Sequence, residues 1–434
     1  MAQGGASAPI AGIHRAPEKE IRQHIDPEWV KKALLHDMLD HWLTASVMPN
    51  GFIQENLDRQ WKPWGTQREA SLNGQGRMSY ALVEGYEYSH DKRYLAAIQK
   101  TLDFLMKMHD DQYGGYYNRT TPDLKVIDDT KTGFTSFAIF PLAQAARVTG
   151  DKRYAKAALD AWGEVRDKMR DGPFFANSLK RDFSGPAPFN LASVGAAGAG
   201  RGARGGTGRG AGVATRRHGL NVHMFEALLA LYDATHSKPV WEEIQSEMAE
   251  MLKLYDYDLG YLPEGFDENW KAAKPKSFNV GHLFEWASLF SRAVELGADP
   301  KFIQLGSRSI DLALKVGYDN EDGATWMNAG ADGTIARRYM IWWTECETLK
   351  ATARYATLHG RSDLWPYFDR TLAFVKKNFL DPEYGGWYEG VIPGSPREAL
   401  GDRAYIKGAV DGPELSAYHQ TTMLTDLLHL TNTK

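Results

Sequence analysis

The chain lacks the features that mark several large protein classes. It has 434 residues but a single cysteine, Cys346, which excludes a disulfide within the chain and a metal cluster held by several thiolates. No run approaches the roughly 18 apolar residues that a membrane-spanning helix needs. The net charge of −4 gives no bulk attraction to nucleic acid or to lipid. We therefore expect a small-molecule ligand, and neither nucleic acid nor a membrane as partner.

The first 26 residues have little that would hold a structure. The start, MAQGGASAPIAGIHRAPEKE, lacks the basic segment and apolar stretch of a signal peptide. Its small residues and prolines predict a loose tail over residues 1–26, followed by one catalytic domain over 27–434. We expect a cytoplasmic monomer or homodimer, or a periplasmic protein if the native N-terminus was trimmed.

Aromatic residues are plentiful, and many stand beside glycines. The chain has 13 Trp and 20 Tyr, with clusters such as YGGYY at 113–117 and YGGWY at 384–388. These glycine-rich links predict short β-hairpins at one mouth of the fold. Exposed rings beside polar groups would stack on a sugar, whereas buried rings would serve only packing.

A repeated turn divides the chain. SHDKRYLAA at 89–97 recurs as TGDKRYAKA at 149–157, and related turns follow at a spacing of about 60 residues, with one longer gap that holds an insertion. The turn residues are good N-caps for the helices after them, and they are Asp91, Asp151, Ser237, Asp299 and Ser362.

Apolar residues recur at three and four positions on each side of these turns, which predicts helical hairpins. The expected hairpins span about 74–109, 132–170, 219–255, 278–316 and 341–379. Two further helices, at about 27–47 and 415–431, would pair and close the ring. The sequence thus predicts an all-α protein, an (α/α)6 barrel of twelve helices in six pairs.

The insertion at about 190–217 is rich in glycine and low in complexity. Gly200, Gly202 and Gly205 match a G-x-G-x-x-G spacing, but no strand precedes them and no βαβ unit surrounds them. We predict a flexible loop or a disordered insertion here rather than a nucleotide site, and we expect no cofactor.

The repeat also aligns polar residues at one height of the barrel. Counting back about 14 residues from each turn gives one position on each inner helix, and His282 lies one turn before its member of that set. His419 stands at the start of the last helix. Imidazoles gathered around one cavity indicate proton transfer near neutral pH. The five aligned residues are Arg77, Phe137, His223, Glu285 and Glu347.

Each of these residues has a simpler alternative. A lone histidine at a helix start is more often a cap, although three at one height favour a site. The pairs His223–Glu226 and His282–Glu285 share helix faces, so the carboxylate can orient the ring. Such pairs also bind metals, with His419 as a third ligand; we expect no metal.

Several segments together resemble the N-acylglucosamine 2-epimerase superfamily. They are NLDRQWKPW, GQGRMSY, NVHMFEA, GHLFEW, IWWTECE, YGGWYE and the terminal AYH. The resemblance covers nearly the whole chain from about residue 27. It implies an (α/α)6 barrel and metal-free proton transfer on a ring-opened reducing sugar.

The resemblance also implies roles for single residues. His282 and His419 would form the acid/base pair, and His223 would assist ring opening or polarise the carbonyl. Arg77 would hold the oxygen at C1 or C2, and Glu285 also falls on a catalytic motif position. The expected substrate-binding residues are Trp343, Glu347, Glu226, Tyr80, Phe137 and Trp387.

The branch within the superfamily follows from smaller differences. Trp286, directly after Glu285, resembles the isomerases, so we predict an aldose–ketose isomerase of the mannose/fructose type over a 2-epimerase. Two positions depart from the pattern: Glu345 stands where glutamine is frequent, and no tryptophan lies five residues before His419.

Two other functions remain open from the residues alone. A glycoside hydrolase on the same barrel would need two carboxylates about 5–9.5 Å apart. The candidates for such a pair are Glu285, Glu345, Glu347 and Asp58. A sugar-binding scaffold without turnover is the third possibility.

Overall fold

The computed structural model describes residues 11–187, 216–217, 219–263, 265–267, 269–272, 275, 277–408 and 416–432. Most of the predicted glycine-rich insertion and residues 1–10 of the predicted tail lie outside these ranges. No helix in the described ranges is long and apolar enough to cross a membrane.

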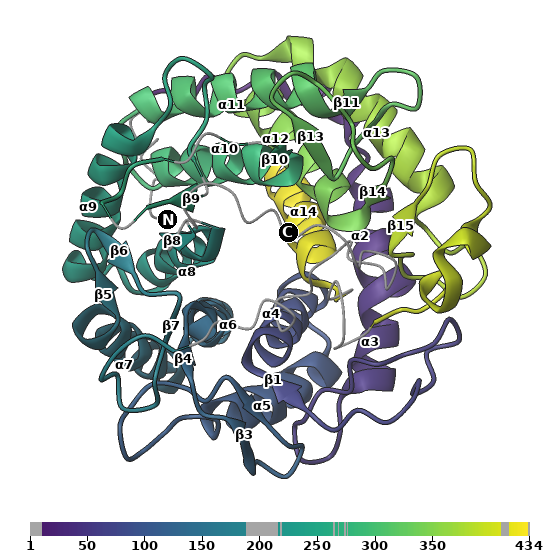
Figure 1. Cartoon of the computed structure of the whole chain (residues 1–434). Coiled ribbons are helices and arrows are strands. Elements are labelled where there is room, and N and C mark those ends of the chain that lie inside the picture. Colours follow the sequence, from purple (N-terminus) through teal and green to yellow (C-terminus); the bar gives the residue numbers. More distant parts are fainter. Residues whose placement is uncertain are drawn as a thin grey trace, which may run out of the picture.

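Two concentric rings of helices form the fold (Figure 1). The inner ring is α4 (Leu72–Ser89), α6 (Ser136–Thr149), α8 (Gly219–Thr235), α10 (Val280–Glu295), α12 (Trp342–Leu358) and α14 (Tyr418–Leu430). The outer ring is α5 (Lys92–Met106), α7 (Lys152–Lys168), α9 (Lys238–Leu254), α11 (Lys301–Gly317), α13 (Trp365–Asn378) and the run from α2 (Pro27–Leu34) to α3 (Asp40–Ser46). Successive inner helices contact one another, and α14 contacts α4. The ring is closed, which confirms the predicted (α/α)6 barrel.

The two rings differ in how their helices are buried. Inner helices such as α12 are buried nearly all round, whereas outer helices such as α5 bury only one face. Close approach of inner helices needs small residues. A Cβ on Gly76 of α4 would lie 1.8 Å from the carbonyl oxygen of Phe137 on α6, so only glycine fits there. This contact sets Arg77 beside Phe137.

The predicted N-caps are only partly right. The side chains of Asp91 and Asp151 accept the backbone N–H of Arg93 and Arg153, as expected. Ser237 makes no such bond. The chain around Ser362 first forms a short 3-10 turn, Ser362–Leu364, and α13 begins after it. A capping residue type therefore marked the turn correctly without always forming the cap.

Short antiparallel strands occupy the links between hairpins. The pairs within one link are β2 (Arg119–Thr120) with β3 (Val126–Asp128), β5 (Arg170–Asp171) with β6 (Phe174–Phe175), and β11 (Tyr318–Asp319) with β12 (Ala324–Thr325). Other pairs join different links: β1 (Ala70–Ser71) with β2, β4 (Lys131–Thr132) with β7 (Ser178–Leu179), β8 (Arg216–Arg217) with β9 (Gly265–Phe266), β10 (Ser277–Asn279) with β13 (Asn328–Gly330), and β14 (Met340–Ile341) with β15 (Gly390–Val391). The links do carry short β-hairpins, but YGGYY and YGGWY form only single bridges, His109 with Tyr116 and Leu380 with Trp387. Further strand pairs tie one link to the next.

The predicted loose tail is wrong for residues 11–26. Helix α1 (Glu18–His24) packs against the outer ring, and Ile21 and Ile25 are fully buried. The His24 ring stacks on Trp365 at a centroid distance of 4.3 Å. Two isoleucines four residues apart are enough apolar surface to dock this short helix.

The predicted helix at 27–47 also differs from the structure. A π-helical segment, Leu35–Leu39, separates α2 from α3. Within it the carbonyl of Asp37 accepts the backbone N–H of Gly386 at 2.5 Å. A carbonyl used by another segment leaves the ordinary helical ladder, which accounts for the wider turn.

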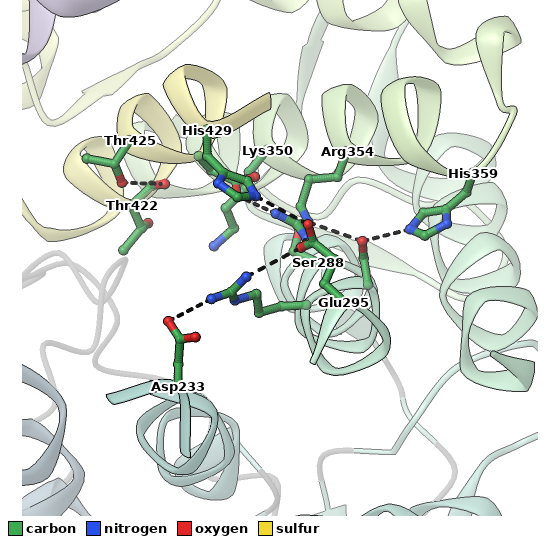
Figure 2. A network of polar contacts seen from close by, with 12 residues as sticks. Asp233, Ser288, Glu295, Lys350, Arg354, His359, Thr422, Thr425 and His429 are labelled. Atoms are coloured by element: carbon green, nitrogen blue, oxygen red, sulfur yellow. Dashed lines mark hydrogen bonds and ion pairs between the residues drawn. The ribbon is translucent and has the colours of Figure 1, made fainter. Parts of the chain in front are cut away.

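Ion pairs join the carboxyl ends of the inner helices. Arg292 lies 2.9 Å from Asp233, and the almost fully buried Arg354 contacts both Glu295 and Asp426. Figure 2 shows the part of this network that involves α8, α10, α12 and α14. We call the whole set the floor network; its members are Glu84 and Glu87 on α4, Arg147 on α6, Asp233 on α8, Arg292 and Glu295 on α10, Arg354 on α12 and Asp426 on α14.

Candidate active site

The amino ends of the same inner helices carry the histidines. His419, in the first turn of α14, places Nδ1 2.8 Å from Oε1 of Glu347 on α12. The other carboxylate oxygen of Glu347 lies 2.7 Å from Nζ of Lys350, one turn further along α12. All three side chains are buried. Glu347 therefore connects an imidazole to an ammonium group, and Nδ1 of His419 carries the proton that it donates to Glu347.

A second imidazole faces Arg77. Nη2 of Arg77 on α4 lies 3.2 Å from Nε2 of His223 on α8. The guanidinium carbon of Arg77 sits 4.6 Å from the centre of the Phe137 ring and 4.7 Å from that of Tyr418. The Arg77 Nε is buried with no hydrogen-bond partner. Two aromatic rings hold this guanidinium, whose positive charge suits a developing anionic oxygen.

Two glutamates support His223 from the other side of its ring. Nδ1 of His223 lies 3.6 Å from Glu226 and 3.7 Å from Glu285. Glu226 also accepts a hydrogen bond from the hydroxyl of Tyr418 on α14. The ring centroids of His223 and His419 are 6.5 Å apart, so the two imidazoles share one site.

The third histidine contacts the same site through an indole ring. The Trp343 ring lies 5.3 Å from the His282 ring and 5.6 Å from the His419 ring, measured between centroids. His282 also lines a cavity of about 160 Å³ between α10 and the link that contains Tyr261 and Phe278. His282 and His419 thus both pack against Trp343, and His282 borders open space.

Burial sets the protonation states of these groups. Burial, aided by the charge of Arg77, lowers the pKa of His223 to about 4, against the opposing effect of Glu226. Burial also lowers the pKa of His419, and the nearby charges of Arg77 and Lys350 add to the effect. Both imidazoles are therefore neutral at pH 7 and able to accept a proton.

The pKa values of two carboxyl groups in the site shift in opposite directions. Burial, with the charge of Glu347 beside it, raises the pKa of Glu285 to about 8, so this carboxyl group is mostly protonated at pH 7. Burial alone would also raise the pKa of Glu226, but bonding to His223 and the charge of Lys350 outweigh it and lower the pKa. The site therefore contains two neutral imidazoles, a mostly protonated Glu285 and an ionised Glu226 at one height of the barrel.

The donor atoms also suit a cation by distance alone. Ligand atoms of His223, Glu226 and Glu285 lie within 4.8 Å of one another, and so do those of Glu285, Glu347 and His419. Positive groups already contact both sets, because Arg77 bonds to His223 and Lys350 to Glu347. We therefore keep the prediction of proton transfer by the residues themselves and assign no metal to these atoms.

The structure does not bring every expected residue into this site. Trp387 is buried against Phe379, with ring centroids 6.2 Å apart, so it serves core packing rather than the predicted sugar contact. Tyr80 is also buried and packs on Phe140 and Tyr418 behind Arg77. The other expected residues lie around the histidines: Arg77, Phe137, His223, Glu226, His282, Glu285, Trp343, Glu347 and His419.

Two residues of the site were missed from the sequence. Tyr418 holds Glu226 and covers Arg77, and Lys350 holds Glu347. Tyr418 precedes His419 in the AYH segment, so the helix start carried a signal. Lys350 follows Glu347 by three residues, one helical turn, and that spacing was the available signal.

The carboxylates proposed for a hydrolase are mostly engaged elsewhere. Asp58 accepts backbone N–H groups of Gln60 and Lys62 in an exposed turn. Glu345 accepts the backbone N–H of Thr325 in β12. Both oxygens of Glu347 are bound, by His419 and Lys350. Among the candidates only Glu285 is left to serve, and glycoside hydrolysis needs two.

Comparison with known proteins gives the family. The sequence pattern of the N-acylglucosamine 2-epimerase (GlcNAc 2-epimerase) family matches residues 24–191 and 208–398. The chain belongs to this family. The resemblance found from the sequence is thereby confirmed.

Relatives in the N-acylglucosamine 2-epimerase family carry both kinds of activity in their names. The chain is 24% identical to a cellobiose 2-epimerase of Eubacterium cellulosolvens over 72% of this chain and 78% of that protein. It is 29% identical to a mannose-6-phosphate isomerase of Rhizobium meliloti (strain 1021) over 38% of this chain, and the match spans 46% of that protein. These relatives are carbohydrate epimerases or isomerases, which confirms the prediction of that enzyme class.

A solved structure of the family confirms the architecture. The cellobiose 2-epimerase of Spirochaeta thermophila DSM 6192 superposes with a TM-score of 0.79 at 20% sequence identity. The superposition covers 95% of this chain and 98% of the other. At this identity the likeness concerns the fold.

Proposed function

We propose that the protein is an aldose–ketose isomerase that acts on a free reducing sugar of the mannose/fructose type. The observation that carries the proposal is the buried pair of His419 and Glu347 beside His223 and Arg77. It provides a neutral base, a donor for an oxyanion and a second imidazole around one position.

The reaction then follows from the protonation states. His223, whose Nε2 accepts from Arg77, assists opening of the sugar ring, and Arg77 faces the carbonyl oxygen. Nε2 of His419, whose Nδ1–H is held by Glu347, removes the proton from C2. The electron pair of that C–H bond forms the C1–C2 double bond of an enediolate, whose anionic oxygen the Arg77 guanidinium stabilises. The proton held by His419 can exchange with solvent before a proton returns to C1, which gives the ketose, and His282, on the other side of Trp343, would be the partner acid.

One requirement separates isomerisation from 2-epimerisation. An aldose–ketose isomerase must move a hydroxyl proton between O2 and O1, whereas an epimerase returns a proton to C2 from the opposite face. Neutral His223 and protonated Glu285 lie 3.7 Å apart and supply a donor and an acceptor for the transfer between oxygens. This pair, together with Trp286 after Glu285, supports the isomerase branch.

Proton exchange from solvent tests the proposal. The purified protein is incubated with mannose, glucose, fructose or cellobiose in deuterated water and followed by NMR. We expect interconversion of mannose and fructose with deuterium at C1 or C2. An epimer without a ketose would assign the 2-epimerase branch instead. No exchange with any of the four sugars would contradict the proposed chemistry.

A further inference from the structure

A buried lysine lies directly beneath the histidines. Lys350 is only 6% exposed, and its Nζ lies 2.7 Å from Oε2 of Glu347. Burial alone works to lower the pKa of Lys350, but the charges of Glu347, Glu226 and Glu285 outweigh it and raise the pKa. The ammonium group therefore keeps its charge at neutral pH.

The charged groups around it come from several helices. Glu347 is on its own helix, α12, while Glu226 faces it from α8 and Glu285 from α10. His419 on α14 lies beyond Glu347, and Arg77 on α4 also acts on that imidazole. Lys350 is thus the cation on the floor side of three buried carboxyl groups, and Arg77 is the cation on the other side.

The contact geometry gives Lys350 a role beyond charge balance. Glu347 uses one oxygen for Lys350 and the other for His419, at 2.7 and 2.8 Å. An ionised Glu347 accepts the Nδ1–H of His419 and leaves Nε2 without a proton. A protonated Glu347 would instead donate to Nδ1, and the imidazole would have to carry its proton on Nε2, where it could no longer act as a base.

We propose that Lys350 is a positioning residue, whose ammonium keeps Glu347 in the form that accepts from His419 and so keeps Nε2 of His419 free to take a proton from the sugar. The proposal rests on the proposed function for its last step. The first step, the tautomer of His419, is a property of the folded protein without substrate.

Lys350→Met tests the proposal through the pH dependence of turnover. Without the ammonium, Glu347 stays buried beside Glu285 and takes up a proton more readily, so the active form exists only at higher pH. We expect the acidic limb of the kcat profile to move up by about 1–3 pH units, with KM nearly unchanged. Lys350→Arg, which keeps the charge, should restore much of the original profile.

A matched control is available at the mouth of the barrel. Lys131 is also fully buried, and its Nζ lies 3.0 Å from Asp110, outside the histidine site. Lys131→Met should reduce thermal stability and leave the pH profile in place. If both variants shift the profile equally, Lys350 is only a structural lysine and the proposal is overturned.

A spectroscopic measurement separates this inference from the proposed function. In ¹⁵N-labelled protein without sugar, His419 should carry its proton on Nδ1 in the wild type and on Nε2 in Lys350→Met at neutral pH. An unchanged tautomer would overturn the proposal even if turnover falls. A changed tautomer in a protein that turns over none of the sugars would support Lys350 and refute the isomerase. If the methionine variant does not fold, Lys350→Gln gives the same expected shift and the same refuting result.

Discussion

Glu347→Gln is the most direct test of the proposed base. The substitution changes no volume, but it replaces a fully buried carboxylate that lies 2.8 Å from Nδ1 of His419. Lys350 requires an acceptor at the other position, 2.7 Å away, so the amide oxygen must face Lys350. The amide nitrogen then faces His419 and donates to Nδ1. The imidazole must move its proton to Nε2 and loses its role as a base.

The loss should match the value of a positioned general base. That value is about 10²–10⁴-fold in kcat, which corresponds to roughly 3–5 kcal/mol in the barrier. KM should change little, because Glu347 is held by Lys350 and His419 rather than directed at the sugar. Initial rates of mannose–fructose interconversion, followed by NMR, measure both constants.

Glu345→Gln is the control for this experiment. Glu345 stands two residues away on the same helix and is equally buried, but it contacts the backbone N–H of Thr325. Burial raises the pKa of Glu345 well above the usual value, which favours the uncharged form of this carboxyl group. The kcat of Glu345→Gln should stay near that of the wild type. A kcat for Glu347→Gln within threefold of that control would refute the assignment of His419 as the base.

Further outcomes are expected for stability, pH dependence, metal removal and helix packing. Arg354→Met leaves Glu295 and Asp426 without their buried cation, so the free energy of unfolding in denaturant should fall by about 3–5 kcal/mol; a loss below 1 kcal/mol would be inconsistent with this role. Turnover should rise with pH through a limb below 6.5, as the histidines lose their protons, and fall near 8 as Glu285 ionises. In Glu285→Gln the fall near pH 8 should disappear; its persistence would assign that limb to another group. Dialysis against a chelator should leave turnover unchanged, and a loss restored by added divalent metal would mean that the site binds a cation. Gly76→Ala should prevent close packing of α4 and α6 and yield little folded protein, as measured by circular dichroism and yield.

The repeat explains why so much of the barrel could be predicted. A turn every 60 residues or so, with apolar spacing on both sides, fixes the hairpins and the height of one position on each inner helix. That height alone predicted that His223, Glu285 and Glu347 belong to the site. Side-chain partners on different helices do not follow from it. The bond from Tyr418 to Glu226 depends on how α14 and α8 face one another across the barrel interior, which no spacing within one helix reveals.

For aromatic residues, too, the sequence does not show which partners the side chain contacts. Trp343 and Trp387 both stand in segments that resemble sugar-binding positions, yet one contacts two histidines and the other packs on Phe379. The composition of a glycine-rich link is the same whether its ring faces the core or a ligand. The helix at residues 18–24 could not be predicted for a different reason. It is too short to be stable alone, and its docking on α13 stabilises it.

The floor network has a consequence for how substrate enters and product leaves the enzyme. Charged side chains from every inner helix meet at the end away from the histidines, and Tyr88 bonds to the carbonyl of Thr425 between α4 and α14. Within the described residues these contacts lie opposite the histidines, so we expect sugars to enter and leave at the mouth that carries the links between hairpins. Substrate and product would then share one entrance, and each should inhibit the reaction of the other competitively.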